Sequence, residues 1–182
     1  MAAGNYKEQE HAFITIGRDI KEGKIPRLVL LCGKEEYLIK FYADMLINKY
    51  VSDACRPIDL VTLEGEFLTL DRIIESVETV SLMSERKVVY LPDFTPAAGK
   101  ALKGFTDSDV TKLTEYFTDI PEGSLLLITA AEEDEKKAEK NRCARLLRNM
   151  AKCMIFSRSR MPSSRILLKK DSEVRERFIP HL

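Results

Sequence analysis

Short apolar runs alternate along the chain with longer segments of helical periodicity. Five runs rich in leucine and β-branched residues predict strands at 27–32, 57–63, 87–91, 124–129 and 152–156. Between them, apolar residues recur every three or four positions, which is typical of helices packed on a sheet. This alternation favours a largely parallel sheet with helices on both faces. We therefore predict an α/β fold of three layers around a five-stranded sheet.

Four helices are predicted among these strands. They span 35–49, 70–80 with Thr69 as N-cap, 107–118, and 132–149, which is acidic at its start and basic toward its end in agreement with the helix dipole. The residues predicted to face the sheet are Tyr37, Leu38, Phe41, Tyr42, Met45 and Leu46 in the first helix, Leu70, Ile73, Ile74 and Val77 in the second, and Val110, Leu113 and Phe117 in the third.

Two segments break the regular alternation. Residues 92–106 contain two prolines, two glycines and small side chains, which predicts an excursion over the surface. Residues 157–165 predict a linker, and 166–179 a short helix or a disordered end. We therefore expect one domain over 1–156 and an appendage over 157–182.

Composition limits the classes of protein to consider. The 182 residues are enough for one core, and 29 acidic residues balance 29 basic ones, so no overall charge attracts a phosphate backbone. No apolar run approaches the roughly 18 residues that span a bilayer. Four cysteines are far apart and lack metal-ligand spacing, so we expect reduced thiols in a cytoplasmic protein; they are Cys32, Cys55, Cys143 and Cys153.

The turn after the first predicted strand does not have the residues of a phosphate-binding loop. A single glycine, Gly33, is followed by Lys34, and then Glu35 and Glu36 stand where they would repel phosphate. We expect Gly33 to form a tight corner and the glutamates to favour the helix dipole. The sequence therefore predicts no cofactor-binding residues here.

Catalytic and metal-binding constellations are also not predicted. The two histidines, His11 and His181, lie at opposite ends of the chain, and the acidic run 132–135 is typical of a solvated surface. An alternative remains open, namely an enzyme of unknown type. Its site would lie at the carboxyl edge of the sheet, near Gly33, the pair Pro92-Asp93 and Thr129.

The end of the second helix carries an apolar pair, Leu82-Met83, between Ser81 and Ser84. If the helix continued at about 100° per residue, each member of the pair would fall about 130° from the apolar stripe, one on either side. The pair is therefore not a continuation of the buried face. Two interpretations follow: ordinary core under the sheet edge, or an exposed apolar wedge offered to a partner.

Two stretches resemble the N-terminal domain of the delta subunit of the bacterial DNA polymerase III clamp loader. The stretch IKEGKIPRLVLLCGKEEYLIKFY at 20–42 is similar to the family's lead into the first strand and the turn and helix that follow. The stretch LDRIIESVETVSLMSERKVVYLPDF at 70–94 is similar to its helix, its small S-L-hydrophobic-S element and its next strand. The resemblance runs from about residue 12 to about residue 156, and the order and spacing of the elements are its specific part.

The resemblance implies a domain shaped like an AAA+ ATPase module that has lost its ATP site. In the family, the residues matching Leu82 and Met83 are the apolar plug that enters the protein-binding groove of the sliding clamp, the beta subunit, and opens one clamp interface. Ser81 and Ser84 would then end the helix and present the pair. The position of Met83 is often phenylalanine in this family.

The resemblance also implies a role in DNA replication without catalysis by this domain. The DNA polymerase III holoenzyme, to which the family belongs, is a DNA-directed DNA polymerase and hence a nucleotidyltransferase. Family members are about twice this length and continue into lid and collar domains that assemble with the other clamp-loader subunits. We expect those two domains to be absent from this chain and DNA to be contacted only indirectly.

Overall fold

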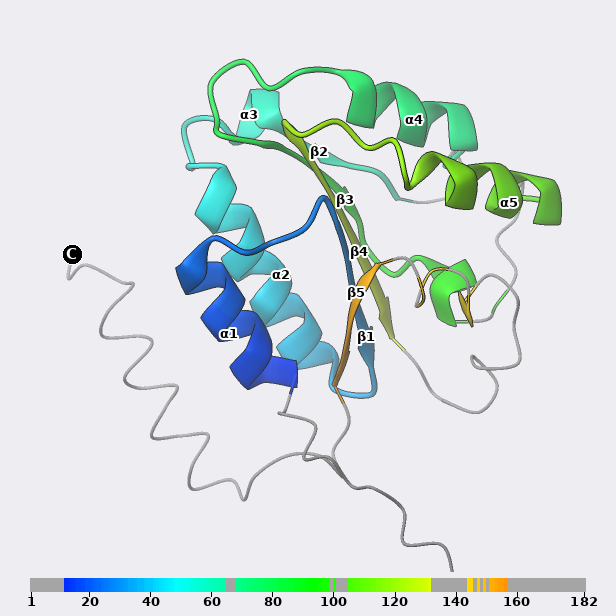
Figure 1. The fold of residues 1–182 in the computed structure, drawn as a ribbon, viewed down its shortest axis with the longest axis horizontal. Helices are drawn as coiled ribbons and strands as arrows, with labels where there is room; N and C mark the ends of the chain where they lie inside the picture. The colour runs from blue at the N-terminus through cyan, green and yellow to red at the C-terminus, as the bar shows by residue number, and fades with distance from the viewer. Residues whose placement is uncertain are drawn as a thin grey trace, which may run out of the picture.

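Five parallel strands form the centre of the molecule in the computed structural model, which describes residues 12–64, 68–98, 100, 105–131, 144–145, 147, 149 and 151–156 (Figure 1). The strands lie in the order β2-β3-β4-β1-β5. Their bounds are Leu28–Gly33 for β1, Leu60–Thr62 for β2, Lys87–Leu91 for β3, Ser124–Ala131 for β4 and Lys152–Phe156 for β5. The predicted parallel sheet is confirmed.

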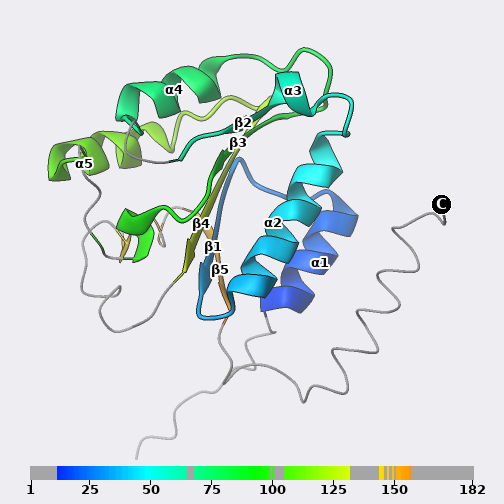
Figure 2. The same ribbon diagram turned by 180° about the vertical axis from the view of Figure 1, so that it is seen from behind.

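Helices cover both faces of this sheet. Helices α1 (Ala12–Glu22) and α2 (Glu36–Tyr50) lie on one face, and α4 (Leu70–Glu78) and α5 (Asp107–Tyr116) lie on the other, as the two opposite views show (Figures 1 and 2). A single turn, α3 (Arg56–Asp59), precedes β2, and the 3-10 helix η1 (Thr95–Ala98) follows β3. Helix α1 was not predicted, although its buried residues Ile16 and Ile20 have the spacing of one helix face.

The core consists of two apolar layers, one on each side of the sheet. One layer packs α4 and α5 through Ile73, Val77 and Leu113, and the other packs α1 and α2 through Ile16 and Leu46. Strand β4 is buried along almost its whole length and contributes alternate residues to both layers. A strand buried on both faces has no polar alternation, which is why the continuous apolar runs predicted it correctly.

The face of α2 that contacts the sheet differs from the prediction. Its buried residues are Ile39, Ala43, Leu46, Ile47 and Tyr50, so of the predicted stripe only Leu46 is fully in the core. Tyr37 is exposed, and it stacks on Phe41 at a centroid distance of 6.4 Å. The helix carries two adjoining apolar stripes, and periodicity does not say which of them meets the sheet.

Two other segments also differ from their predictions. The run 57–63 was expected to be a strand throughout, but Pro57 stands at the start of α3 and the strand begins only at Leu60. Proline favours the first turn of a helix and cannot donate to a sheet ladder. Among the described residues of the segment 92–106, Phe94, Pro96 and Ala97 are buried, so the part of the excursion around η1 packs into the core instead of standing on the surface.

Some predictions lie outside the described residues. They are the acidic start of the helix at 132–149 up to residue 143, the appendage 157–182, and His11, His181 and Cys143. Within the part of the chain that the structure describes, Cys32 and Cys55 are free thiols. In that same part, no helix is long and apolar enough to span a bilayer.

A capping box starts α5 and gives a direct test of local stability. Thr106 Oγ1 accepts a hydrogen bond from Asp109 N, and the Asp109 side chain accepts one from Thr106 N at 2.8 Å. We expect Thr106→Ala to cost about 1 kcal/mol of unfolding free energy, because a helix amide loses its acceptor. Urea unfolding measures this cost. Thr118→Ala, in the exposed turn after α5, is the matched control, and equal costs for the two variants would contradict the capping role.

Candidate functional site: the loop before β3

The loop between α4 and β3, residues 79–86, exposes three apolar side chains. Val80 is 70% exposed, Leu82 74% and Met83 61%. The interpretation of Leu82-Met83 as core is therefore wrong, because both side chains are exposed. The loop runs past α3 at the edge of the sheet where the strands begin (Figures 1 and 2).

Both ends of this loop are fixed to the body of the domain. Helix α4 ends at Glu78, two residues earlier than predicted, and Thr79 donates through its amide and its hydroxyl to Glu75 O at 3.2 and 2.8 Å. At the other end, Arg86 Nη1 donates to Ile25 O at 2.9 Å, and its guanidinium group lies 5.0 Å from the centroid of the Tyr50 ring. The exposed segment is therefore short and its endpoints are defined.

The serines on either side of the apolar pair bond to each other. Ser81 Oγ donates to Ser84 O at 2.8 Å and accepts from Ser84 N at 3.2 Å. This closes a four-residue loop with the pair at its tip. Both serines are half-buried, so they form the base of the loop instead of its contact surface. The prediction that they present Leu82 and Met83 agrees with this arrangement but stays a prediction.

A buried carboxylate beneath the loop was not predicted. Asp59, the last residue of α3, accepts from Leu82 N through Oδ1 and from Met83 N through Oδ2, each at 2.9 Å. Its side chain is completely buried. The available sequence signal was an acidic residue inside the apolar run 57–63, just before a strand, and the assignment of the whole run to a strand hid it.

The environment of Asp59 favours its charged form. Burial by itself raises the pKa, but the amides of Leu82 and Met83 and the nearby hydroxyls of Ser84 and Ser81 outweigh burial and lower the pKa from 3.8 to about 2. Ser84 Oγ is buried and makes no hydrogen bond of ordinary geometry within the described chain, yet it lies close enough to act on the carboxylate. Asp59 is therefore an anion at neutral pH.

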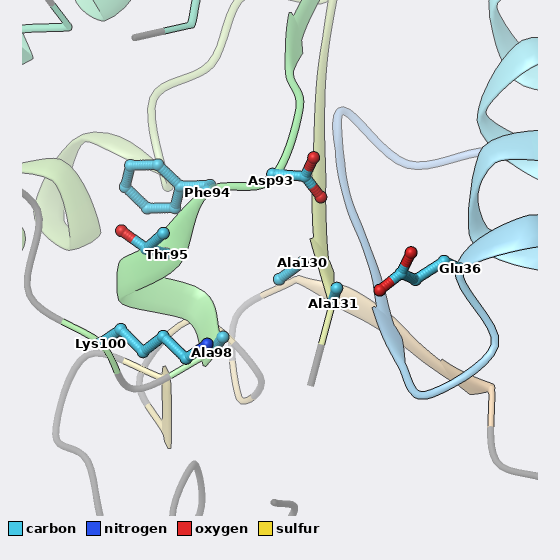
Figure 3. Close-up of a pocket in the computed structure, with 8 residues that line it drawn as sticks. All are labelled: Glu36, Asp93, Phe94, Thr95, Ala98, Lys100, Ala130 and Ala131. Atoms are coloured by element: carbon cyan, nitrogen blue, oxygen red, sulfur yellow. The ribbon is translucent and has the colours of Figure 1, made fainter. Parts of the chain in front are cut away.

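A second candidate site lies at the opposite edge of the sheet, where the strands end. A cavity of about 230 Å³ is lined by Glu36, Asp93 and Lys100 among others. Figure 3 shows Glu36 and Asp93 on either side of the end of β4, which pairs with Gly33 at Ala131. The sequence-based alternative had placed an enzyme site at this edge.

The described hydrogen bonds at this carboxyl edge stabilise the turn that follows β3. Thr129 Oγ1 accepts from Asp93 N at 3.2 Å, and Thr129 O accepts from Phe94 N at 2.8 Å. Gly33 has a φ of 138°, which agrees with its predicted role as a tight corner. Among the described residues, no group of three or more His, Cys, Asp or Glu side chains is placed to hold a metal ion.

Two solved structures have a fold similar to that of this chain. A Bacillus subtilis DNA clamp loader delta protein superposes with a TM-score of 0.67 and 21% identity, covering 79% of this chain and 42% of that one. A DNA polymerase III gamma subunit-related protein from Thermotoga maritima superposes with a TM-score of 0.54 and 14% identity, covering 91% of this chain and 52% of the other. The chain thus spans about half the length of these proteins, and the fold resembles a clamp-loader or AAA+ domain.

The sequence itself assigns the chain to a family within that class. The family model described as "DNA polymerase III, delta subunit" matches residues 29–156, which is more than half of the chain. No curated protein sequence matches. The chain belongs to the DNA polymerase III delta subunit family. Members of this family act in DNA replication and are in general non-catalytic components of the clamp loader.

Proposed function

We propose that this chain binds the DNA polymerase sliding clamp through Leu82 and Met83 and opens it for loading onto DNA during replication. One observation supports this most strongly: two large apolar side chains project from a loop whose backbone is held from below. Membership of the delta subunit family supports the proposal that the partners are the sliding clamp, the beta subunit, and the other clamp-loader subunits. The chain would contact DNA only indirectly, and it would act in the cytoplasm.

The size of the contact is consistent with this role. Complete burial of two such side chains in a pocket contributes on the order of 3–6 kcal/mol. A free energy of that size shifts a clamp between closed and open states only if the pair binds the open state more tightly. Opening therefore requires the apolar pair to fit the groove best when one clamp interface has separated.

Titration of purified sliding clamp with the full chain tests the proposal. We expect saturable binding at tens of micromolar or tighter, and a peptide that occupies the clamp's protein-binding groove should compete with it. Release of clamps already loaded on nicked circular DNA then reports opening. No binding at these concentrations would remove the mechanism, and binding that the peptide does not affect would place the contact elsewhere.

The charges that line the cavity at the carboxyl edge disfavour nucleotide binding there. Two carboxylates, those of Glu36 and Asp93, and one ammonium group, that of Lys100, line it, and the excess of negative charge disfavours a triphosphate. We therefore expect no binding of ATP with Mg²⁺ up to about 1 mM by calorimetry. Saturable binding that is altered by Glu36→Gln would instead support the alternative of an enzyme with its site at this edge.

A further inference from the structure

Both oxygens of the Asp59 carboxylate accept hydrogen bonds from the backbone of the apolar pair. One oxygen accepts from the amide of Leu82 and the other from the amide of Met83, and the side chain has no exposed surface. Hydrogen bonds to an ionised carboxylate are stronger than those between neutral groups. Two consecutive amides in an irregular loop are therefore fixed by a single charged acceptor.

The sheet brings these two segments together. Leu60 in β2 pairs with Val88 in β3, so the residues just before the two parallel strands lie at the same edge. Asp59 immediately precedes β2, and its own amide donates to Cys55 O at 2.9 Å within α3. Helix α3 is a single turn, so it is too short for its dipole to explain an aspartate here. The amides of the loop do.

The exposed side chains would otherwise tend to turn inward. Removing the surfaces of Leu82 and Met83 from water is favourable, and a flexible loop would populate conformations in which they pack against their own domain. Turning the pair inward would break two charge-assisted hydrogen bonds to Asp59 and leave a buried carboxylate without two of its donors. The bonds therefore favour the outward arrangement and reduce the ordering cost that a partner would meet.

We propose that Asp59 is a positioning residue for partner binding: its carboxylate holds the backbone of Leu82 and Met83 so that both side chains project outward, without touching the partner itself. This inference rests on the proposed clamp contact. It adds a residue outside the 79–86 loop to the determinants of that contact, and it predicts that the loop's order depends on one buried anion.

A second effect of Asp59 has to be separated from this one. The buried side chain of Lys87, at the start of β3, has a pKa that burial lowers and the charge of Asp59 raises. Loss of the carboxylate would therefore affect Lys87 as well as the loop. Lys87→Met is the matched control, since it removes this charge interaction and keeps an unbranched side chain of similar length. It leaves in place the hydrogen bonds from the amides of Leu82 and Met83 to Asp59.

Amide hydrogen exchange and clamp titration together test the inference on the full chain. In the unaltered protein, the amides of Leu82 and Met83 should exchange at least about tenfold more slowly than unprotected amides, although their side chains are exposed. Asp59→Asn should remove most of this protection and weaken clamp binding at least about tenfold, since its amide group offers one acceptor instead of two. Asp59→Ala should have the larger effect, and Lys87→Met should change both quantities less than about threefold.

Each outcome decides a separate question. Unprotected amides in the unaltered protein, or unchanged clamp binding by Asp59→Asn, would overturn the inference. So would weaker binding with the two amides still protected, because Asp59 would then act by another route. If Asp59→Ala does not fold, Asp59→Asn and the exchange data on the unaltered protein still decide. If the unaltered chain binds no clamp, the proposed function fails, and amide protection alone reports whether Asp59 holds the loop.

Discussion

Simultaneous Leu82→Ala and Met83→Ala substitution lowers the affinity for the sliding clamp at least about 30-fold and leaves the melting temperature unchanged. The loss is expected because the two side chains are the anchors of the proposed contact, and truncation of such anchors commonly costs more than about 1 kcal/mol each. The melting temperature should not change, because both side chains are mostly exposed in the free protein. Surface plasmon resonance and differential scanning calorimetry measure the two quantities.

Tyr37→Ala is the matched control for this double variant. Tyr37 is also a large apolar residue and is 65% exposed, but it lies at the start of α2, at the edge of the sheet opposite the loop. We expect its loss to leave clamp affinity unchanged. Equal losses for both variants would indicate general apolar adhesion, and an unchanged affinity of the double variant would show that the pair is not the anchor.

Replacement of Asp59 by asparagine makes the unfolding free energy of the domain less dependent on pH between about pH 4 and pH 2. Because the pKa of Asp59 is lowered to about 2 in the folded protein, its contribution to stability is complete above the unfolded value of 3.8 and is lost as the pH falls toward 2. The unaltered protein should therefore be more stable than Asp59→Asn near neutral pH. The difference should shrink between about pH 4 and pH 2.

Urea unfolding midpoints of the two proteins across that pH range measure the effect. Asp44→Asn provides the same substitution on an exposed carboxylate of α2, and it should stay within about 0.5 kcal/mol of the unaltered protein throughout. A constant difference between Asp59→Asn and the unaltered protein at every pH would show that the carboxylate is not held in its charged form by the loop amides.

Helical phase predicted that the apolar pair leaves the buried stripe of α4, and it left core packing and exposure open as two interpretations. The stripe of α4 is short and regular, with Ile73 and Val77 fully buried, but the helix ends at Glu78, so the loop conformation and not helical phase sets the exposure of Leu82 and Met83. The same reasoning did not settle the face of α2. There the apolar positions exceed what one face of the sheet can bury, and the outcome depends on tertiary packing.

The role of Asp59 could not be predicted from local pattern. Its donors lie 23 and 24 residues away, and they approach only because β2 and β3 pair in parallel with one particular register. Periodicity and propensity describe neighbours along the chain and do not describe such contacts. An acidic residue within an apolar run is a usable signal, since a buried charge requires donors.

In the 79–86 loop, main-chain atoms make the hydrogen bonds that hold the loop, and the side chains of Leu82 and Met83 are exposed. Asp59 and Ser81 hold backbone atoms, whereas the side chains at positions 82 and 83 take no part in any of these bonds. Other side chains at these two positions would therefore leave the hydrogen bonds that hold the loop unchanged. Met83→Phe, for example, would alter the fit to a partner and leave folding unaffected, so partner affinity in this protein can be tuned independently of stability.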